Sequence, residues 1–421
     1  MAKTTRRTGP TRSGGSLGAR VAQAEMRAAN MGLILRHLRS GGGRSRARLA
    51  SETGLSRATI SSVVSDLAER GLVREGAVLR DGAVGRPGQT VSIDGAQVAG
   101  IGLEISVHQT VLTALTLDGT VIREVITSLD VARLEMDVVL DRVAGLLRRA
   151  LDSLREAGVE VVGITVSPPG IIDYSEGALR FAPNLGWRGI PLRDELVRRL
   201  GADGPTIHLE NDAKLAALAE YQRLAAQGIH DLVHLTGEVG VGAGIIVDGR
   251  LLRGWSGFSG EVGHLPLGRP DVRCNCGRLG CWETAVGLES LLQAAFAPDD
   301  PLGDALVPAE ERLRVLAERA AAEDARTLEA LEAIAVALIP GLSILVDVLN
   351  PRLIVLGGYY SYFSDQLLPR LAAGLDDRCI DAGTAVELKT STLGPTASAR
   401  GGALLALESV FDDPSLVGVR L

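Results

Sequence analysis

Three of the chain's four cysteines lie within one eight-residue stretch, CNCGRLGC, from Cys274 to Cys281, and His264 stands ten positions before the first of them. Thiolate sulfur and imidazole nitrogen are ligands that suit Zn²⁺ in closed structural sites. Three free thiols in a loop would instead be a redox liability. The spacing therefore indicates a metal-binding loop and favours it over three unligated cysteines.

The elements that position this loop belong to a chain of 421 residues, a length typical of about three globular units. The irregular cysteine spacing does not predict a disulfide framework, so we expect a reducing compartment. The basic N-terminus lacks the apolar stretch of a signal peptide, and the uncharged apolar run 333–346 is too short to cross a bilayer. We expect a cytoplasmic protein without a membrane segment.

Charge is unevenly distributed along the sequence. Residues 1–90 contain 16 Lys or Arg and 6 Asp or Glu, a balance of +10; because the whole chain carries −7, the remaining 331 residues sum to −17. Local positive charge neutralises phosphates whatever the global sign. We therefore expect a nucleic-acid-binding head on an acidic body. Residues 1–21, rich in Gly, Ser, Thr and Arg, are expected to form a disordered basic arm, with or without a role in DNA contact.

Residues 22–94 carry the pattern of a winged helix-turn-helix DNA-binding domain. Ser45 is placed to cap a short helix that ends at Thr53, and Gly54 supplies the turn. Ser56 is placed to cap a second helix with an apolar face. In such domains the second helix offers its N-terminal residues to base edges in the major groove. The side chains expected there are Arg57, Thr59, Ser61 and Ser62.

Two strands joined by a glycine-rich loop follow, and together they predict the wing. The first begins at Leu72, the second is Thr90–Ile93, and the loop DGAVGRPGQ lies between them. Its Arg86, between a glycine and a proline, is expected to enter a minor groove. Two short helices with a glycine turn also occur as an ordinary helical hairpin. The capping serines, the basic charge and the wing in this order favour the DNA-binding domain.

From residue 98 onward the chain alternates strand-like and helix-like segments. A three-stranded meander over 98–130 precedes an expected helix over 136–157 and a buried strand over 161–167. Further strand-like segments lie at 231–235, 243–247 and 353–356. Two alternating halves predict an α/β body over 98–421, with two lobes and a cleft between them.

Six motifs, in order, resemble those of the ROK family of repressors and sugar kinases. They are APNLGW (182–187), ENDAKLAALAE (210–220), GEVGVGAGIIVDGRLLRG (237–254), GEVGH (260–264), CNCGRLGCWE (274–283) and NPRLIVLGG (350–358). With the head included, the resemblance covers nearly the whole chain after the arm. It implies an actin-like, hexokinase-like body, and the pairing of this body with a winged helix-turn-helix resembles the family's transcriptional regulators.

The resemblance also implies two sets of site residues. Matching the family's metal motif residue by residue assigns a structural Zn²⁺ to His264, Cys274, Cys276 and Cys281. Matching its sugar contacts assigns a sugar site to Asn184, Asn211, Asp212, Glu261, His264 and Glu283. Carboxylates, amides and an imidazole suit such a ligand because a sugar presents donors and acceptors around its ring. His264 would bind the metal through one ring nitrogen and face the sugar with the other.

The same motifs raise the question of kinase activity. Family kinases use the aspartate of an Asn-Asp pair as general base toward a sugar hydroxyl, and the matching residue here is Asp212. The first phosphate-binding turn, however, is LEISVHQ, with Glu104 where the family has aspartate and bulkier side chains after it. The second has Glu238 where kinases usually have threonine, and a carboxylate repels a polyphosphate. We expect no enzymatic activity, with an ATP-dependent sugar kinase as the alternative.

The sequence therefore predicts a sugar-responsive, DNA-binding transcriptional regulator that acts as a repressor. Its expected partners are operator DNA and a sugar or sugar derivative, which changes operator affinity by favouring one arrangement of the lobes. A homodimer or a dimer of dimers on a palindromic operator is the expected assembly. Two alternatives stay open: an active sugar kinase with a DNA-binding head, and a metal loop that serves as a separate zinc module for protein contacts.

Overall fold

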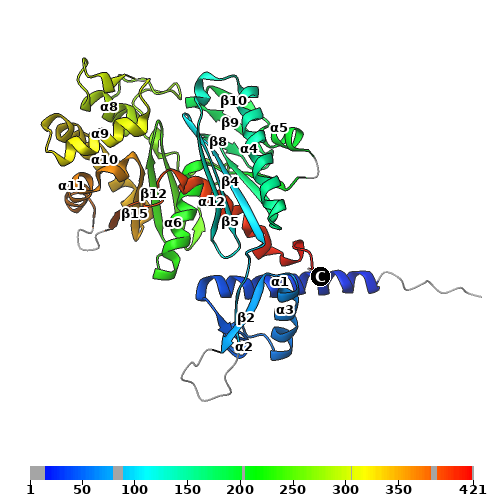
Figure 1. Cartoon of the computed structure of the whole chain (residues 1–421). Coiled ribbons are helices and arrows are strands. Elements are labelled where there is room, and N and C mark those ends of the chain that lie inside the picture. The colour runs from blue at the N-terminus through cyan, green and yellow to red at the C-terminus, as the bar shows by residue number, and fades with distance from the viewer. Residues whose placement is uncertain (1–14, 79–88, 202–203, 305, 381–385, 420–421) are drawn as a thin grey trace, which may run out of the picture. The chain divides into compact units, whose positions relative to one another are not determined.

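The computed structural model describes residues 15–78, 89–201, 204–304, 306–380 and 386–419. The chain divides into two compact units. One, the head, joins the segment up to Gly95 with the C-terminal residues from Glu408, and the other, the body, is Ala96–Leu407 (Figure 1). The sequence pattern placed all residues after 98 in the body, whereas the C-terminal segment groups with the head.

The head has three helices and a small antiparallel sheet among its described residues up to Gly95. The helices are α1 (Gly15–Gly41), α2 (Arg46–Thr53) and α3 (Arg57–Glu69). The strands are β1 (Arg44–Ser45), β2 (Val73–Val78) and β3 (Gln89–Ile93), in the order β1-β3-β2. Helix α1 begins at Gly15, inside the stretch that the composition assigned to a disordered arm.

Local capping sets the boundaries of the two short helices in the head. Ser45 Oγ accepts a hydrogen bond from the Arg48 amide at 3.2 Å, and Gly54 ends α2 in the left-handed conformation. Ser56 Oγ accepts from the Thr59 amide at 3.1 Å at the start of α3. These are the caps that the sequence predicted. The apolar face of α3, formed by Ile60, Val63, Val64 and Leu67, is buried.

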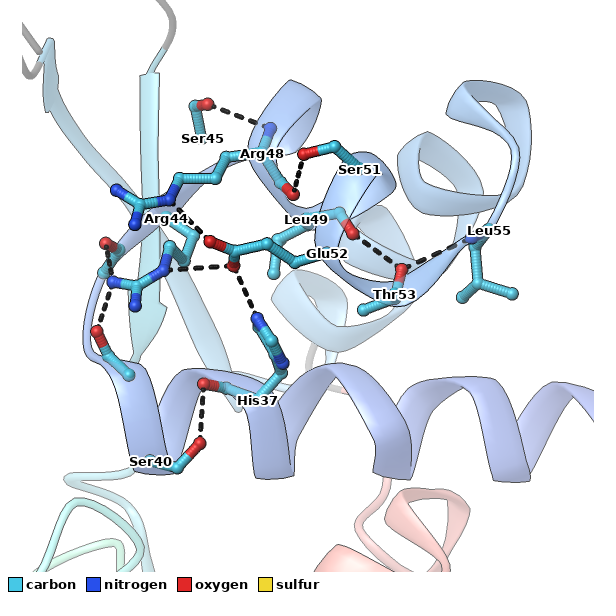
Figure 2. A network of polar contacts seen from close by, with 12 residues as sticks. His37, Ser40, Arg44, Ser45, Arg48, Leu49, Ser51, Glu52, Thr53 and Leu55 are labelled. Atoms are coloured by element: carbon cyan, nitrogen blue, oxygen red, sulfur yellow. Dashed lines mark hydrogen bonds and ion pairs between the residues drawn. The ribbon is translucent and has the colours of Figure 1, made fainter. Parts of the chain in front are cut away.

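A polar network around Glu52 holds α2 to the end of α1 (Figure 2). Glu52 Oε2 lies 2.5 Å from His37 Nε2 and accepts from Arg44 Nε at 3.2 Å, while Oε1 accepts from Arg48 Nε at 2.6 Å. Hydrogen bonds from His37 and Arg48 lower the pKa of Glu52 to about 2. The carboxylate therefore stays charged throughout the physiological pH range.

The first lobe of the body is built on a five-stranded sheet in the order β11-β7-β4-β5-β6. Its strands are β4 (Val98–Ile105), β5 (Gln109–Thr116), β6 (Val121–Ser128), β7 (Glu160–Ser167) and β11 (Thr206–Leu209). Helices α4 (Met136–Glu156) and α5 (Leu192–Leu200) lie beside this sheet in Figure 1. A smaller antiparallel sheet consists of β8 (Ile171–Asp173), β9 (Ala178–Ala182) and β10 (Trp187–Ile190).

The second lobe contains another five-stranded sheet, in the order β14-β13-β12-β15-β16. Its strands are β12 (Leu232–Gly237), β13 (Val241–Val247), β14 (Arg250–Leu251), β15 (Leu353–Gly358) and β16 (Glu387–Thr390). The helices of this part of the chain are α6 (Asp212–Leu224), α7 (Glu283–Val286), α8 (Leu288–Ala295), α9 (Ala309–Ala321), α10 (Ala325–Leu349), α11 (Ser364–Asp376) and α12 (Ala397–Asp412).

The two large sheets repeat one topology. In each, three antiparallel strands come first in the chain (β4-β5-β6 and β12-β13-β14), and two strands then add in parallel beside the first of them (β7 and β11; β15 and β16). This duplicated arrangement is the two-lobed, actin-like body that the resemblance implied. The predicted fold class, a winged helix-turn-helix followed by an α/β body, is confirmed.

Helices α12 and α10 both pack against the interior of the body. Helix α12 packs closely on β4, because a Cβ on Gly102 would lie 1.8 Å from the carbonyl oxygen of Ala399. Helix α10 is long and apolar enough to span a membrane by length and composition, yet half of its most apolar window is buried inside the protein. Its Leu331, Leu338 and Leu342 belong to the main core of the second lobe, which accounts for the apolar composition.

Candidate functional sites

The body contains a cavity of about 290 Å³ lined by residues from both lobes. Its walls include the end of β4, the start of α6, and the turn between β12 and β13. All six residues assigned to the sugar site line this one cavity: Asn184, Asn211, Asp212, Glu261, His264 and Glu283. They come from four separate motifs of the sequence, so the fold brings together what the chain separates by up to a hundred residues.

Two of these residues are fixed by the N-terminus of α6. Asn211 caps the helix, with Oδ1 accepting from the Lys214 amide at 3.2 Å and Nδ2 donating to the carbonyl oxygen of Gly170 at 3.2 Å. The Asp212 carboxylate accepts from the Ala213 amide at 2.9 Å. Burial nevertheless raises the pKa of Asp212 to about 6. Both side chains are therefore held in place without their remaining hydrogen-bonding capacity being used.

A buried polar network beneath Asn211 was not foreseen from the sequence. Lys214 is 1% exposed, and its Nζ donates to the carbonyl oxygen of Gly257 at 2.6 Å and to Tyr174 Oη at 3.1 Å. Tyr174 donates to Glu210 Oε1 at 2.6 Å, an oxygen that also accepts from the Asn211 amide at 2.9 Å. A buried lysine requires such partners. The only sequence signal was a lysine inside an otherwise small and apolar helix, ENDAKLAALAE.

Glu104, Glu238 and His234 are polar residues that also line the cavity, beyond the assigned sugar site. Glu104 lies near the end of β4 and Glu238 directly after β12, at positions that the sequence singled out as departures from a phosphate-binding pattern. Burial, and the charges of Glu238 and Asp212, raise the pKa of Glu104. Burial and the charge of Asp212 raise the pKa of Glu238 to about 7. The third residue, His234, lies within β12 and was missed, because one histidine in an apolar strand reads as core.

The four residues assigned to the metal converge at one edge of the cavity. One ligand atom each from His264, Cys274, Cys276 and Cys281 lies within 4.8 Å of all the others. Cys276 Sγ is 3.6 Å from Cys281 Sγ, and Cys274 Sγ is 3.8 Å from His264 Nδ1. Zn–S bonds of about 2.3 Å at tetrahedral angles put the sulfurs about 3.8 Å apart. The donor set and its spacing therefore fit a tetrahedral zinc ion.

The geometry of His264 connects this cluster to the cavity. Its Nδ1 lies on the side of Cys274, whereas its Nε2 lies 3.9 Å from Glu261 Oε2. Glu283 Oε1 is 2.7 Å from Cys274 Sγ, and Asn275 Nδ2 donates to Asn184 Oδ1 at 2.9 Å. The loop that carries the cysteines thus touches three residues assigned to the sugar site.

The side chains assigned to DNA lie on the first turns of α3. Arg57, Ser61 and Ser62 are exposed, and Thr59 is half-buried. Ser62 Oγ accepts a hydrogen bond from Arg27 Nη2 at 3.2 Å, and the Thr59 hydroxyl pairs with that of Ser56 at 2.9 Å. The exposed face is suited to a groove of DNA. Arg86, the assigned wing residue, lies outside the described residues.

Comparison with known proteins agrees with this division of the chain. Residues 100–409 match the ROK family, and residues 32–83 match the MarR family. The chain is 27% identical over 393 residues to a xylose repressor from Bacillus spizizenii, covering 93% of this chain and 98% of the relative. It is 30% identical over 276 residues to a glucokinase from Halalkalibacterium halodurans, covering 64% of this chain and 83% of the relative.

Among solved structures, the chain is similar to a ROK family transcriptional regulator described as a homolog of the Escherichia coli MLC protein. The TM-score is 0.75 at 22% identity, and the match covers 92% of this chain and 97% of that one. At this identity the likeness shows the fold alone. The relatives therefore include both a repressor and a kinase, and the choice between these functions depends on the site.

Proposed function

The chain belongs to the ROK family, and from that premise we propose that it is a sugar-responsive, DNA-binding transcriptional regulator that acts as a repressor. One observation carries the proposal: a winged helix of the MarR type is joined to a body in which one cavity is lined by all six residues assigned to a sugar. The xylose repressor is similar over almost its whole length, head included. A catalytic body alone would not need the head.

Sugar recognition is proposed to rest on Asn184, Asn211, Asp212, Glu261, His264 and Glu283. Amides both donate and accept, ionised carboxylates accept, and a neutral imidazole does one of each, so the set matches ring hydroxyls. The network through Lys214 and Glu210 supports this assignment, because it holds Asn211 in one orientation before any ligand arrives. A preorganised site loses less entropy on binding.

Zinc is the proposed structural ion, held by His264, Cys274, Cys276 and Cys281. The ion would supply the bonds that close the cysteine loop, and all four positions of its tetrahedron would be filled by protein. The Nε2 atom of His264 would then remain on the side of the sugar. This arrangement favours a zinc loop that serves the sugar site over a separate module for protein contacts, because Asn275 and Glu283 tie the loop to the cavity.

DNA recognition is proposed for Arg57, Thr59, Ser61 and Ser62 on α3, with Arg86 in the wing. A sugar that favours one arrangement of the lobes would change operator affinity by its differential binding to the two arrangements. A homodimer, or a dimer of dimers, on a palindromic operator in the cytoplasm is the proposed setting. In a gel-shift titration across a broad panel of sugars, at least one sugar is expected to change the affinity for operator DNA. If no sugar changed that affinity, the proposal would be refuted.

The alternative function is an ATP-dependent sugar kinase with Asp212 as general base. Its pKa of about 6 is suited to a base near neutral pH. Against this stand the carboxyl groups of Glu104 and Glu238, which line the cavity where nucleotide phosphates would have to lie. An ADP-release assay distinguishes the two functions. Turnover with any hexose or pentose that Asp212→Asn abolishes would establish the kinase, whereas a sugar effect on DNA binding without turnover supports the regulator.

A further inference from the structure

The inner wall of the cavity carries more acidic side chains than a sugar site needs. Glu104, Asp212 and Glu238 come from three different segments and line the same space. Glu104 is 5% exposed, so its carboxylate has little water to solvate it. Each of these groups titrates at a higher pH than usual because burial disfavours its charge, and the pKa values of Glu104 and Glu238 rise further because Asp212 is near.

His234 provides a second, independent sign that this wall faces a ligand. The side chain is 1% exposed, lines the cavity, and neither ring nitrogen has a hydrogen-bond partner among the described residues. Burial lowers the pKa of His234 to about 4, so the ring is neutral and offers one donor and one acceptor. His234 and Thr236 on β12 and Glu238 directly after it are alternate residues, and all three line the cavity.

Little positive charge offsets these carboxylates. Among the described residues that line the cavity, five are carboxylic acids and one is an arginine, Arg278. Arg278 belongs to the cysteine loop, two residues after Cys276. Lys214 lies nearby, but its ammonium group donates to Tyr174 and to the Gly257 carbonyl. The inner wall therefore presents acceptors and one neutral imidazole without a committed cation.

Two helix N-termini are the features that would favour an anion here. The first amides of α6 already donate to Asn211 and Asp212. The start of α12, with Ala397 and Ser398, also lines the cavity. A helix N-terminus is equivalent to about half a positive charge. The two termini together supply about one positive charge, which does not compensate three carboxylates once these are ionised, so the field at the inner wall is then negative.

We propose that this inner wall, with Glu104, Asp212, Glu238 and His234, accepts the hydroxyl groups of an unphosphorylated sugar and excludes sugar phosphates and nucleotides. The inference rests on the proposed function and narrows its effector to sugars without a phosphate. A phosphate dianion could enter only if the carboxylates moved away or took up protons from water. One unit-charge repulsion at about 4 Å weakens binding between about fivefold in water and several hundredfold in a protein-like medium.

Matched ligand pairs test this inference on the full-length, zinc-loaded protein. Calorimetric titrations would compare glucose with glucose 6-phosphate, N-acetylglucosamine with its 6-phosphate, and xylose with xylose 5-phosphate. At least one free sugar should bind, with its phosphate at least about tenfold weaker. Tighter binding of any sugar phosphate than of its parent sugar would overturn the inference and leave the proposed function intact. Binding by none of the six compounds would count against both.

A variant separates the carboxylates from other causes of exclusion. Glu104→Gln/Glu238→Gln replaces two carboxyl groups with almost no change in shape. At about pH 8–9, above the raised pKa of Glu238, the sugar phosphate should therefore bind at least about tenfold more tightly than it does to the natural protein. Glu176→Gln, at an exposed glutamate between β8 and β9, is the control and should change nothing. An unchanged phosphate affinity in the double variant, with tryptophan fluorescence showing a native fold, would overturn the inference.

Discussion

Replacing Glu238 by glutamine should stabilise the body at alkaline pH and do so less as the pH falls. Glu238 follows β12 and lines the cavity together with Glu104 and Asp212. Its burial and the nearby charge of Asp212 raise its pKa from 4.5 to about 7. In the unfolded chain the carboxyl regains its ordinary value. At alkaline pH the buried, charged Glu238 therefore lowers the free energy of unfolding, and a neutral glutamine at this position does not.

The sign follows from proton linkage. Because the folded-state pKa is the higher one, the folded protein binds more protons than the unfolded chain between pH 4.5 and about 7. Below pH 4.5 Glu238 is protonated in both states and does not reduce the free energy of unfolding. As the pH rises through about 7, ionisation of the buried carboxyl lowers the free energy of unfolding. The wild type thus loses stability over this interval, and Glu238→Gln does not lose that share. The difference between the two proteins grows with pH and then levels off.

The pKa shift of Glu238 sets an upper limit on the change in the free energy of unfolding. A rise from 4.5 to about 7 corresponds to at most about 3.5 kcal/mol, at about 1.4 kcal/mol for each pH unit. Glu238 keeps part of its surface open to the cavity, so water there reduces the cost. We expect Glu238→Gln to raise the free energy of unfolding by about 1 to 3 kcal/mol near pH 8 and by less than about 1 kcal/mol near pH 5.

Urea denaturation followed by tryptophan fluorescence measures this difference in the body alone, because all three tryptophans, Trp187, Trp255 and Trp282, lie within Ala96–Leu407. Curves for Glu238→Gln and the wild type would be compared near pH 5 and near pH 8, with the exposed Glu176→Gln as control. A stability difference that is the same at both pH values, or a loss of stability near pH 8, would refute the reasoning from burial and charge.

Three further predictions concern the head and the metal. Ser56→Ala removes the cap of α3 and should lower the free energy of unfolding of the head by about 0.5–2 kcal/mol. Denaturation followed by circular dichroism measures this loss, and an unchanged stability would show that the cap contributes nothing. Arg57→Ala should weaken operator binding by about 1–3 kcal/mol and relax the specificity for the contacted base; an equal loss on operator and non-operator DNA in gel shifts would argue against a base contact. Cys276→Ser should release zinc, measured by atomic absorption, and reduce the sugar response, whereas Cys379→Ser, outside the cluster, should do neither; full sugar affinity without zinc would refute the link.

The local structure of the head was predictable because short-range chemistry determines it. Ser45 and Ser56 satisfy backbone amides within three residues of themselves, and Gly54 adopts a conformation that few other residues tolerate. Such signals need no knowledge of the rest of the fold. The same holds for the apolar face of α3. Met26 shows the limit of the argument: it shares the spacing of the buried residues of α1 but is 66% exposed.

The cavity was predictable only in part. Its six sugar-site residues were assigned through motifs, and the fold brings all of them to one place. His234 had no such signal, since its exposure to the cavity depends on β12 lying between β13 and β15. The network of Lys214, Tyr174 and Glu210 likewise joins segments that only the tertiary fold brings together. The grouping of the C-terminal residues with the head arises in the same way: Arg39 stacks on Phe411 with its guanidinium carbon 4.0 Å from the ring centre.

The contact between Asn275 and Asn184 bears on how metal and sugar would be coupled. Asn275 lies in the cysteine loop next to α7, whereas Asn184 follows β9 in the first lobe, so their hydrogen bond of 2.9 Å joins the two lobes at the rim of the cavity. The bond is exposed and contributes only about 1 kcal/mol. A loop without its metal would lose more entropy in making that bond and would make it less often. Zinc would then affect the sugar site in two ways: it would lower the entropy lost when Asn275 bonds to Asn184 across the lobes, and it would fix the position of His264.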